Sequence, residues 1–216
     1  MRGLERYAPL SGVLFVVFVI VSTIVVGETP SADDGAAKAV GFWAANKDEV
    51  IAGAIIAAIS TVFMLWFAGV WRATLAASEG PGSRLATTAF GGLVVAAIGW
   101  TALYTFGFIA ADTSGDVPAQ VTWTLSVLQA DFFFPLAIGF AVFLLASGLA
   151  LLRGAAFPDW PGWVALVLGL VCVTPGGFFG VLGGLAWILG ISVMLFMRGT
   201  PTMPGSPATE PLGPPD

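Results

Sequence analysis

The chain has 216 residues, of which 57% are hydrophobic and only 10% are charged, and its formal net charge is −5. Soluble domains usually carry about 25% charged residues, so this composition excludes a water-soluble fold and predicts one integral membrane domain built of helices. The sequence holds no cluster of basic residues, which argues against nucleic acid as a partner, and the lipid bilayer is the expected one.

Four apolar runs predict the first four membrane-spanning helices. They lie over residues 8–27, 50–71, 87–110 and 131–152. Each is near the roughly 20 residues that cross a bilayer as a helix. The first run follows Arg2 and Arg6 and is longer than the apolar region of a secretory signal peptide, so we expect an uncleaved helix, with cleavage as the alternative.

The last apolar run is too long for one span and is interrupted at Thr174-Pro175. Thr174 can cap a helix that begins at Pro175. We therefore predict two further helices, over residues 160–174 and 176–197, joined by a tight turn. A re-entrant hairpin is the alternative. The prediction is thus an all-α bundle of about six transmembrane helices.

The charges predict how this bundle is oriented. With six spans, one side carries Arg2, Arg6, Arg72, Arg84, Arg153 and Arg198. The other side carries only Lys38 and Lys47 among the basic residues. Because Lys and Arg concentrate in cytoplasmic loops, both termini of the six-helix domain, residues 1–198, are predicted to be cytoplasmic. The Pro-rich tail, residues 199–216, is expected to be a disordered cytoplasmic segment.

Tryptophans near the predicted span ends are typical of an aromatic belt at the membrane surface. They are Trp43, Trp71, Trp123, Trp160 and Trp163. If this interpretation is right, their rings should lie at the level of the lipid headgroups. The belt would then mark the two edges of the hydrocarbon region.

Two outer segments are predicted to carry short helices with apolar faces. In residues 28–49, Asp33 and Asp34 can cap a helix whose apolar face rests on the membrane surface. That face consists of Ala36, Val40 and Trp43. In residues 111–131, helix four is expected to start early and project outward, with a kink near Pro135. Its apolar face consists of Val121, Leu125, Leu128 and Phe132.

The residue inventory excludes several kinds of chemistry. The sequence contains no histidine, one cysteine (Cys172) and no phosphate-binding GxxxxGK[ST] motif. Histidine-bound haem, HExxH zinc sites and Ser-His catalysis are therefore excluded. Only one intramembrane carboxylate is available, whereas an aspartyl protease needs two. We therefore expect no catalytic residues, no metal site, no cofactor and no enzyme activity.

Asp131 is the candidate transport or gating residue, because ionisable groups inside membranes are usually functional. It lies 22 residues before Arg153, about 33 Å along a helix, which places it near the outer interface. We expect an interfacial or helix-start carboxylate, with a cation or proton gate at the outer mouth as the alternative. Gln129, Thr122 and Ser126 can line the same vestibule, although helical geometry directs them away from Asp131.

Hydroxyl side chains within the predicted spans are the other candidate ligand contacts. They are Ser60, Thr61, Thr101, Tyr104 and Thr105. Such hydroxyls usually bond the carbonyl four residues earlier or a neighbouring helix, and we expect that here. Contact with a ligand is the alternative.

Small residues recur at helical spacing on two of the predicted helices. One set is Gly92, Ala96 and Gly99; the other is Gly176, Gly180 and Gly184, with Gly183, Ala186 and Gly190 beside it. Small residues let helix backbones approach closely in a membrane. We expect packing within this bundle, with a homo-oligomer contact or a glycine-lined pore as alternatives.

The stretch Phe157-Pro158-Asp159-Trp160-Pro161-Gly162-Trp163 follows an Arg-ended helix, and a long acidic loop follows the first helix. Both features resemble loops of uncharacterised multi-pass bacterial membrane proteins. The resemblance implies a six-helix fold and a bacterial plasma (cell) membrane. It implies no activity, so no functional residue is transferred from it.

The sequence as a whole favours a non-enzymatic accessory or assembly subunit, because packing signals are many and candidate chemistry is sparse. A second membrane protein or another copy of the chain is the expected partner. The alternative function is a small transporter or channel with Asp131 at its outer mouth. A membrane enzyme without histidine is a third class, for which no nucleophile–base pair is evident.

Overall fold

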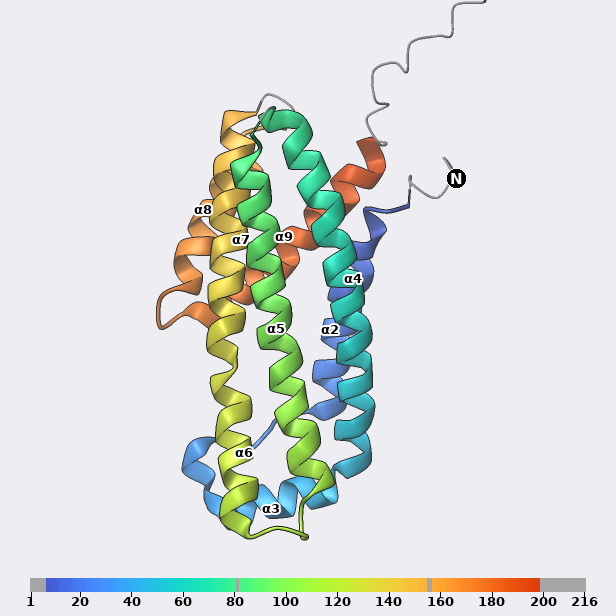
Figure 1. The fold of residues 1–216 in the computed structure, drawn as a ribbon, viewed down its shortest axis with the longest axis vertical. Helices are drawn as coiled ribbons and strands as arrows, with labels where there is room; N and C mark the ends of the chain where they lie inside the picture. The colour runs from blue at the N-terminus through green and yellow to red at the C-terminus, as the bar shows by residue number, and fades with distance from the viewer. Residues whose placement is uncertain (1–6, 81, 155–156, 199–216) are drawn as a thin grey trace, which may run out of the picture.

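The computed structural model describes residues 7–80, 82–154 and 157–198, and all regular structure in these residues is helical (Figure 1). The elements are α2 (Leu10–Val26), the 3-10 helix η1 (Ala32–Asp34), α3 (Gly35–Ala45), α4 (Lys47–Glu79), α5 (Arg84–Asp112), α6 (Ala119–Asp131), α7 (Phe133–Arg153), α8 (Trp160–Cys172) and α9 (Gly177–Arg198). The tail predicted over residues 199–216 lies outside the described residues.

Four helical segments of the described chain are long and apolar enough to cross a membrane: α4, α5, the combined α6–α7 segment and α9. The helices α2 and α8 are apolar but shorter, with 17 and 13 residues. At 33 and 29 residues, α4 and α5 are about 50 and 44 Å long. Both exceed the roughly 30 Å of a bilayer's hydrocarbon core, so their ends extend beyond it.

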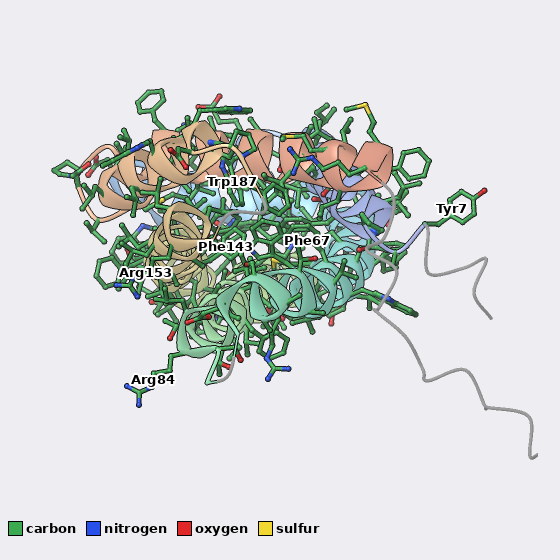
Figure 2. The ribbon with its side chains drawn as sticks, turned by 90° about the horizontal axis from the view of Figure 1, so that it is seen from above. Tyr7, Phe67, Arg84, Phe143, Arg153 and Trp187 are labelled. Carbon is green, nitrogen blue, oxygen red and sulfur yellow. The ribbon has the colours of Figure 1, made fainter. Side chains whose placement is uncertain are left out.

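The long helices run side by side, and α9 crosses them at an angle (Figure 1). The most extensive contacts join α5 to α7, α4 to α5 and α2 to α4. Seen from above, α8 and α9 form one side of the molecule, and α4 and α5 form the opposite side (Figure 2). The helices α3 and α6 lie at the end of the bundle opposite the start of α2.

The break in the last apolar run lies between α8, which ends at Cys172, and α9, which begins at Gly177. Thr174 stabilises this turn with its side chain. The Gly176 N–H donates a hydrogen bond to Thr174 Oγ1 at 3.2 Å, and Thr174 Oγ1 donates to the Val171 carbonyl at 2.8 Å. The chain therefore reverses here, where the sequence placed a cap and a proline.

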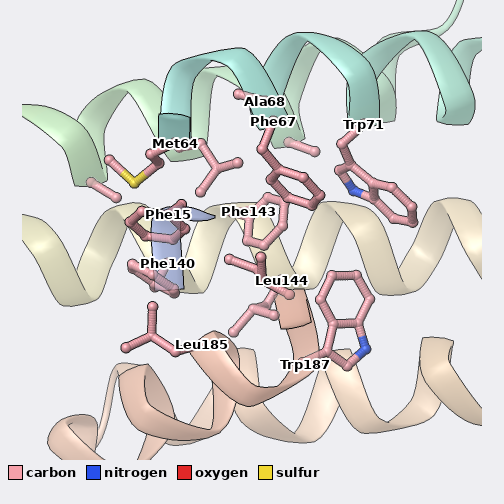
Figure 3. Close-up of a cluster of buried hydrophobic side chains, with 14 of the residues drawn as sticks. Phe15, Met64, Phe67, Ala68, Trp71, Phe140, Phe143, Leu144, Leu185 and Trp187 are labelled. Carbon is pink, nitrogen blue, oxygen red and sulfur yellow. The ribbon is translucent and has the colours of Figure 1, made fainter. Parts of the chain in front are cut away.

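The core is an aromatic cluster that joins α4, α7 and α9 (Figure 3). The rings of Trp71 and Trp187 meet edge to face with centroids 5.5 Å apart. Phe143 lies 5.8 Å from Trp187, and Phe67 stacks on Trp71 at 6.3 Å. Figure 2 shows Phe67, Phe143 and Trp187 in the interior between the two sides of the bundle. Edge-to-face pairs add about 0.5–1.5 kcal/mol beyond area burial.

Buried indole N–H groups are paired across helices. Trp71 of α4 donates to Ser147 Oγ of α7 at 2.9 Å. Trp100 of α5 donates to Ser60 Oγ of α4, also at 2.9 Å. Two further indoles follow the same pattern: Trp43 donates to Ser126 Oγ, and Trp187 donates to the Pro161 carbonyl. Each bond satisfies a donor that water does not reach.

Two of the five tryptophans in the predicted aromatic belt are buried in the protein. Trp43 and Trp71 are 0% and 1% exposed, because serines on neighbouring helices accept their N–H groups and no interfacial water is needed. Trp160 and Trp163 are 58% and 61% exposed, as belt residues would be. The fifth member, Trp123, is half-buried.

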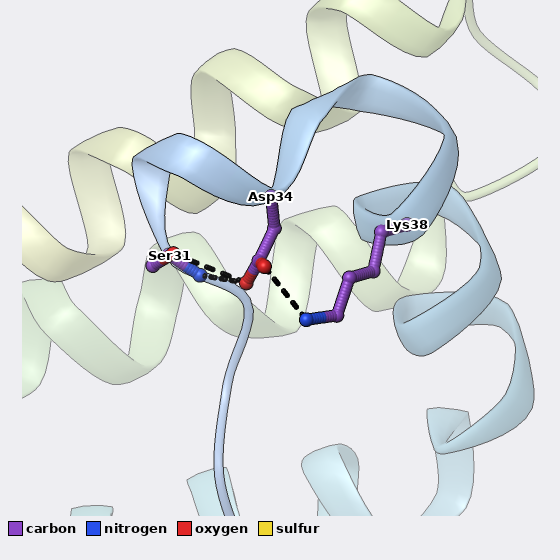
Figure 4. A network of polar contacts seen from close by, with 3 residues as sticks. All are labelled: Ser31, Asp34 and Lys38. Atoms are coloured by element: carbon purple, nitrogen blue, oxygen red, sulfur yellow. Dashed lines mark hydrogen bonds and ion pairs between the residues drawn. The ribbon is translucent and has the colours of Figure 1, made fainter.

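The outer segment before α3 is shaped by Asp34 (Figure 4). Lys38 Nζ donates to Asp34 Oδ1 at 2.6 Å, and the Ser31 N–H donates to Asp34 Oδ2 at 2.8 Å. These contacts, that of Lys38 first, hold the pKa of the Asp34 carboxyl below its ordinary value. Asp34 occupies the N-cap position of α3, but its side chain makes no capping hydrogen bond to that helix and instead closes a capping box with Ser31 at η1.

The face of α3 that the sequence assigns to the membrane surface packs in part against the protein itself, since Trp43 is buried and Ala36 and Val40 are half-buried. Ala39 and Trp43 are buried, in a cluster that includes Val50 of α4 and Ala110 and Ala111 of α5. The physical reason is the projecting ends of α4, α5 and α6, which offer α3 an apolar surface of the protein itself. α3 therefore closes one end of the bundle.

The apolar face that the sequence indicates on α6 is largely not buried. Val121 and Leu128 are 45% and 37% exposed. The buried residues of this helix are instead Thr122, Ser126 and Gln129. The helix is interrupted at Phe132, three residues before Pro135. Pro135 lies in the first turn of α7, where a backbone N–H would have no partner within the helix, so proline is tolerated there.

Basic residues occupy both ends of the bundle, but unequally. Arg84 begins α5, Arg153 ends α7 and Arg198 ends α9, all at the same end (Figure 1). Figure 2 shows Arg84 and Arg153 pointing outward there. At the opposite end, Lys47 forms a salt bridge with Asp112 at 3.0 Å.

Candidate functional site

A cavity of about 340 Å³ lies where α2, α5, α7 and α9 meet, and Trp43 of α3 bounds one end of it. We call it the Gln129 cavity. Its lining includes Val26, Tyr104, Gln129, Leu136, Val181 and Leu185. Most lining side chains are apolar, and no charged side chain belongs to the lining in the described part of the chain. Its volume is within the roughly 300–1,000 Å³ of ligand pockets.

Gln129 brings the one buried amide to this cavity. It lies near the end of α6 and is only 7% exposed. Its Oε1 is buried and has no hydrogen-bond partner among the described residues. Buried polar atoms are paired in the large majority of cases, and an unpaired one costs about 1–3 kcal/mol. The oxygen itself is buried, so a molecule in the cavity does not reach it.

A second wall of the cavity is fixed by hydrogen bonds between helices. Tyr104 of α5 donates from its hydroxyl to Ser22 Oγ of α2 at 3.1 Å. Ser22 in turn donates to the Val19 carbonyl at 2.9 Å. The Tyr104 ring lies 4.7 Å from that of Trp100, whose N–H is paired with Ser60. These bonds hold the wall in one arrangement.

The end of the cavity beside α3 is closed by Trp43, whose N–H donates to Ser126 Oγ. Ser126 donates to the Thr122 carbonyl at 3.2 Å. Gly107 of α5 faces the same place, since a methyl group there would lie 3.5 Å from the Trp43 ring and 3.7 Å from Gln129 Cγ. The absence of a side chain at Gly107 thus helps to leave the cavity open.

Asp131 lies outside this cavity. It ends α6, is exposed, and lines a separate hollow of about 310 Å³ next to Thr174 in the α8–α9 turn. It takes part in no salt bridge among the described residues. Gln129 and Ser126 are buried on the other face of α6, so the structure does not bring them together with Asp131.

The intramembrane hydroxyls mostly bond their own helices. Ser60 and Thr61 both donate to the Ala57 carbonyl, at 2.7 and 3.0 Å. Thr105 donates to the Thr101 carbonyl at 2.8 Å. None of these side chains lines the hollow beside Asp131 in the described structure. Of the five predicted hydroxyl candidates, the Gln129 cavity contains that of Tyr104.

The small residues of α5 face α7. A methyl group on either Gly92 or Gly99 would lie 2.5 Å from a backbone nitrogen of α7. Ala96 lies in the same contact, directly beside Gly139. The backbones of the two helices therefore touch along this stripe, which leaves no space for a larger side chain.

The small residues around α9 divide between two neighbours and open space. Gly180 and Gly183 face α8, whereas Gly184 faces α7. Gly176 lies in the turn before α9. Nothing lies within 4 Å of a methyl group placed on Gly190. The stripe thus packs the α8–α9 hairpin onto itself and onto α7.

The described residues contain no group of three or more His, Cys, Asp or Glu side chains placed to hold a metal ion. Cys172 is free and buried, against Gly180 at the α8–α9 contact. Neither observation supplies a catalytic arrangement.

Sequence reasoning missed the cavity, although its polar signal was present. Thr122, Ser126 and Gln129 follow the i, i+4, i+7 spacing of one helical face. In a membrane protein such a polar face turns toward the interior, because lipid cannot satisfy it. These three residues are predicted from the sequence to line a vestibule with Asp131, whereas the structure buries them, and Gln129 is the one of the three that lines the cavity.

No family model matches the chain, and no curated protein and no solved structure matches it either. A function is therefore inferred from the chain's own residues.

Proposed function

We propose that this chain is an integral protein of a bacterial plasma membrane, which it crosses six times with both termini in the cytoplasm. Four helical segments with the length and apolarity to cross a membrane support this, together with the shorter apolar helices α2 and α8. The distribution of charge supports the orientation. Arginines gather at the end where α5 begins and α7 and α9 end, and such an end is usually cytoplasmic.

Within that membrane, the chain acts as a non-enzymatic accessory or assembly subunit. One observation carries this proposal: every Asp, Glu, Lys and Arg among the described residues is exposed or half-exposed. Ion and proton pathways run past ionisable groups inside the protein, and acid–base catalysis needs them in a cleft. An interior of aromatic and small side chains instead supports a rigid subunit that acts through its surface.

The transporter alternative is less well supported. Its candidate residue, Asp131, is exposed at the end of α6, and it is the only charged residue in the lining of its hollow within the described chain. A gate at this position would have no second ionisable group to pass an ion to. We therefore favour the accessory function.

The two functions are separated by purifying the tagged chain from its own host membrane in lipid nanodiscs and weighing the complex by native mass spectrometry. The accessory function predicts a second membrane protein in fixed stoichiometry. A monomer or homo-oligomer, together with ion flux in proteoliposomes that is lost in Asp131→Asn, would overturn it. Asp116→Asn, at an exposed carboxylate of the α5–α6 loop, is the matched control.

A further inference from the structure

We propose that the hollow of about 310 Å³ beside Asp131 binds the primary ammonium group of an ethanolamine phospholipid in the outer leaflet. We call it the Asp131 hollow. This inference rests on the proposed membrane location and orientation but not on the accessory function. Four features carry it: a carboxylate without a cationic partner in the described structure, backbone acceptors around it, phenylalanine rings and the depth of the hollow.

Asp131 supplies the charge that a cation needs. It is exposed at the end of α6 and belongs to the lining of the hollow. Among the described residues, no Lys or Arg side chain forms a salt bridge with it, and no second charged residue belongs to the lining. A single carboxylate favours a ligand with a single positive charge, and it leaves no further group to which a transported ion could pass. The hollow is therefore suited to holding a cation and not to conducting one.

Uncharged acceptors lie around the same hollow. Pro135 has no N–H, so the Asp131 carbonyl lacks the donor that an uninterrupted helix would supply four residues later. Across the hollow, α8 ends at Cys172, and a helix C-terminus carries partial negative charge. Thr174 in the following turn also lines the hollow, and its hydroxyl oxygen keeps one lone pair after the two hydrogen bonds of the turn. A primary ammonium group has three N–H donors for such acceptors, whereas a quaternary ammonium group has none.

Phenylalanine rings form the rest of the wall. Phe133, Phe134 and Phe178 belong to the lining. The rings of Phe133 and Phe178 contact one another, with centroids 6.3 Å apart. Phe134 follows Asp131 by three residues and is 68% exposed, so its ring is open to a ligand. Aromatic faces attract ammonium groups, so an organic ammonium can use the carboxylate and the rings together.

The depth of the hollow indicates a lipid as the source of this group. α7 has 21 residues, from Phe133 to Arg153, and is about 31 Å long, which matches the roughly 30 Å of a hydrocarbon core. With Arg153 at the cytoplasmic surface, Asp131 lies at the level of the outer headgroups. Val173 and Phe178 beside the hollow are 61% and 56% exposed, so in a membrane the hollow opens among side chains that face lipid. An ethanolamine headgroup reaches this level, and its phosphate can remain in water.

The test uses the full chain in nanodiscs made from equal amounts of three dioleoyl phospholipids, which carry ethanolamine, choline and glycerol headgroups. Native mass spectrometry counts the lipids that stay bound when the nanodisc is stripped from the chain. The ethanolamine lipid should be retained about tenfold over the glycerol lipid, the worth of one charge-assisted hydrogen bond. It should be retained about threefold over the choline lipid, whose ammonium group has no N–H donor.

Two pairs of variants locate the site. Asp131→Asn changes an exposed side chain, so it should fold, and it should lose the tenfold preference for the ethanolamine lipid over the glycerol lipid. Asp116→Asn, at an exposed carboxylate of the α5–α6 loop, should keep this preference. Phe134→Leu should reduce the preference about two- to fivefold, the worth of an exposed contact between a cation and a ring. Phe108→Leu, at an exposed ring of α5 that does not line the hollow, should leave it unchanged.

Equal retention of the ethanolamine and glycerol lipids overturns the proposal, as does equal retention of the ethanolamine and choline lipids or an unchanged preference in Asp131→Asn. A carbodiimide, which joins a carboxylate to a primary amine in contact with it, then identifies the occupant in host membranes. The expected product is an Asp131 peptide that carries an ethanolamine phospholipid. An Asp131 peptide joined to a lysine of another protein would overturn the lipid as occupant. A chain that does not insert into nanodiscs would contradict the membrane location, whereas the absence of a partner protein would contradict only the accessory function.

Discussion

The contact between α5 and α7 is where one added methyl group should do the most damage. A methyl group on Gly92 would lie 2.5 Å from the backbone nitrogen of Phe143 and 2.9 Å from the Gly139 carbonyl oxygen. Both are backbone atoms of α7, which cannot rotate away as a flexible side chain can. Gly92→Ala must therefore move the two helices apart along their whole contact.

The neighbouring Gly91 provides the matched control, since nothing lies within 4 Å of a methyl group placed there. Both substitutions gain about 1 kcal/mol of helix propensity. Only Gly92→Ala also pays for overpacking, which costs about 1–3 kcal/mol. We expect Gly92→Ala to have a free energy of unfolding about 1–3 kcal/mol lower than Gly91→Ala, which itself should be neutral or slightly stabilised.

The difference is measured by unfolding the two variants in mixed micelles with a rising fraction of denaturing detergent. Tryptophan fluorescence reports the transition, because Trp71 and Trp100 are buried in the core beside this contact. Equal free energies of unfolding for Gly91→Ala and Gly92→Ala would refute the close approach of α5 and α7. A larger loss at Gly91 would refute the assigned faces of α5.

Three further predictions concern polar contacts. Ser147→Ala removes the acceptor of the buried Trp71 indole and should lower the free energy of unfolding by about 1–2 kcal/mol. A double-mutant cycle with Trp71→Phe should give a coupling energy of about 0.6–1.7 kcal/mol. A coupling energy of zero would disprove the hydrogen bond. The contact with Lys38 lowers the pKa of the Asp34 carboxyl. The stabilisation from this contact is therefore present at pH values above the ordinary pKa of Asp and is lost as the pH falls through the lowered pKa. In Lys38→Ala, titration followed by the carboxyl ¹³C shift should show the pKa of Asp34 rising toward its ordinary value. The Glu79 carboxylate accepts hydrogen bonds from the backbone N–H groups of Leu85 and Ala86 at the start of α5, at 3.0 and 3.1 Å. Glu79→Gln should therefore speed hydrogen exchange of these two amides about two- to fivefold. Unchanged exchange rates would contradict this cap.

The positions of the helices could be read from the sequence, because a membrane imposes a simple rule on it. Long apolar runs must be helical where lipid offers the backbone no partner. The Thr174-Pro175 pair marks a helix end on local grounds alone, and the turn between α8 and α9 lies there. The bounds of α4 and α5 were less accurate, because helices continue past the hydrocarbon region whenever other protein covers their ends, as α3 and α6 do here.

The orientation of α6 could not be read in the same way. Its apolar residues form one face in the sequence, yet Val121 is exposed and Thr122 is buried. The buried face is polar because Trp43 and Ser126 form a hydrogen bond across to α3. That bond depends on a partner 83 residues away, so no local pattern in α6 predicts it.

The Gln129 cavity could not be predicted from the sequence, because it depends on how the helices cross one another. α9 packs on α7 where Gly184 faces Phe140, and on α2 where Gly12 faces Ser192. It must therefore run obliquely from one helix to the other (Figure 1). The space it leaves beside the second half of α2 is bounded by residues from several helices, Gln129 of α6 among them. A tightly packed core would have favoured an apolar residue at this position, because an orphaned acceptor costs stability.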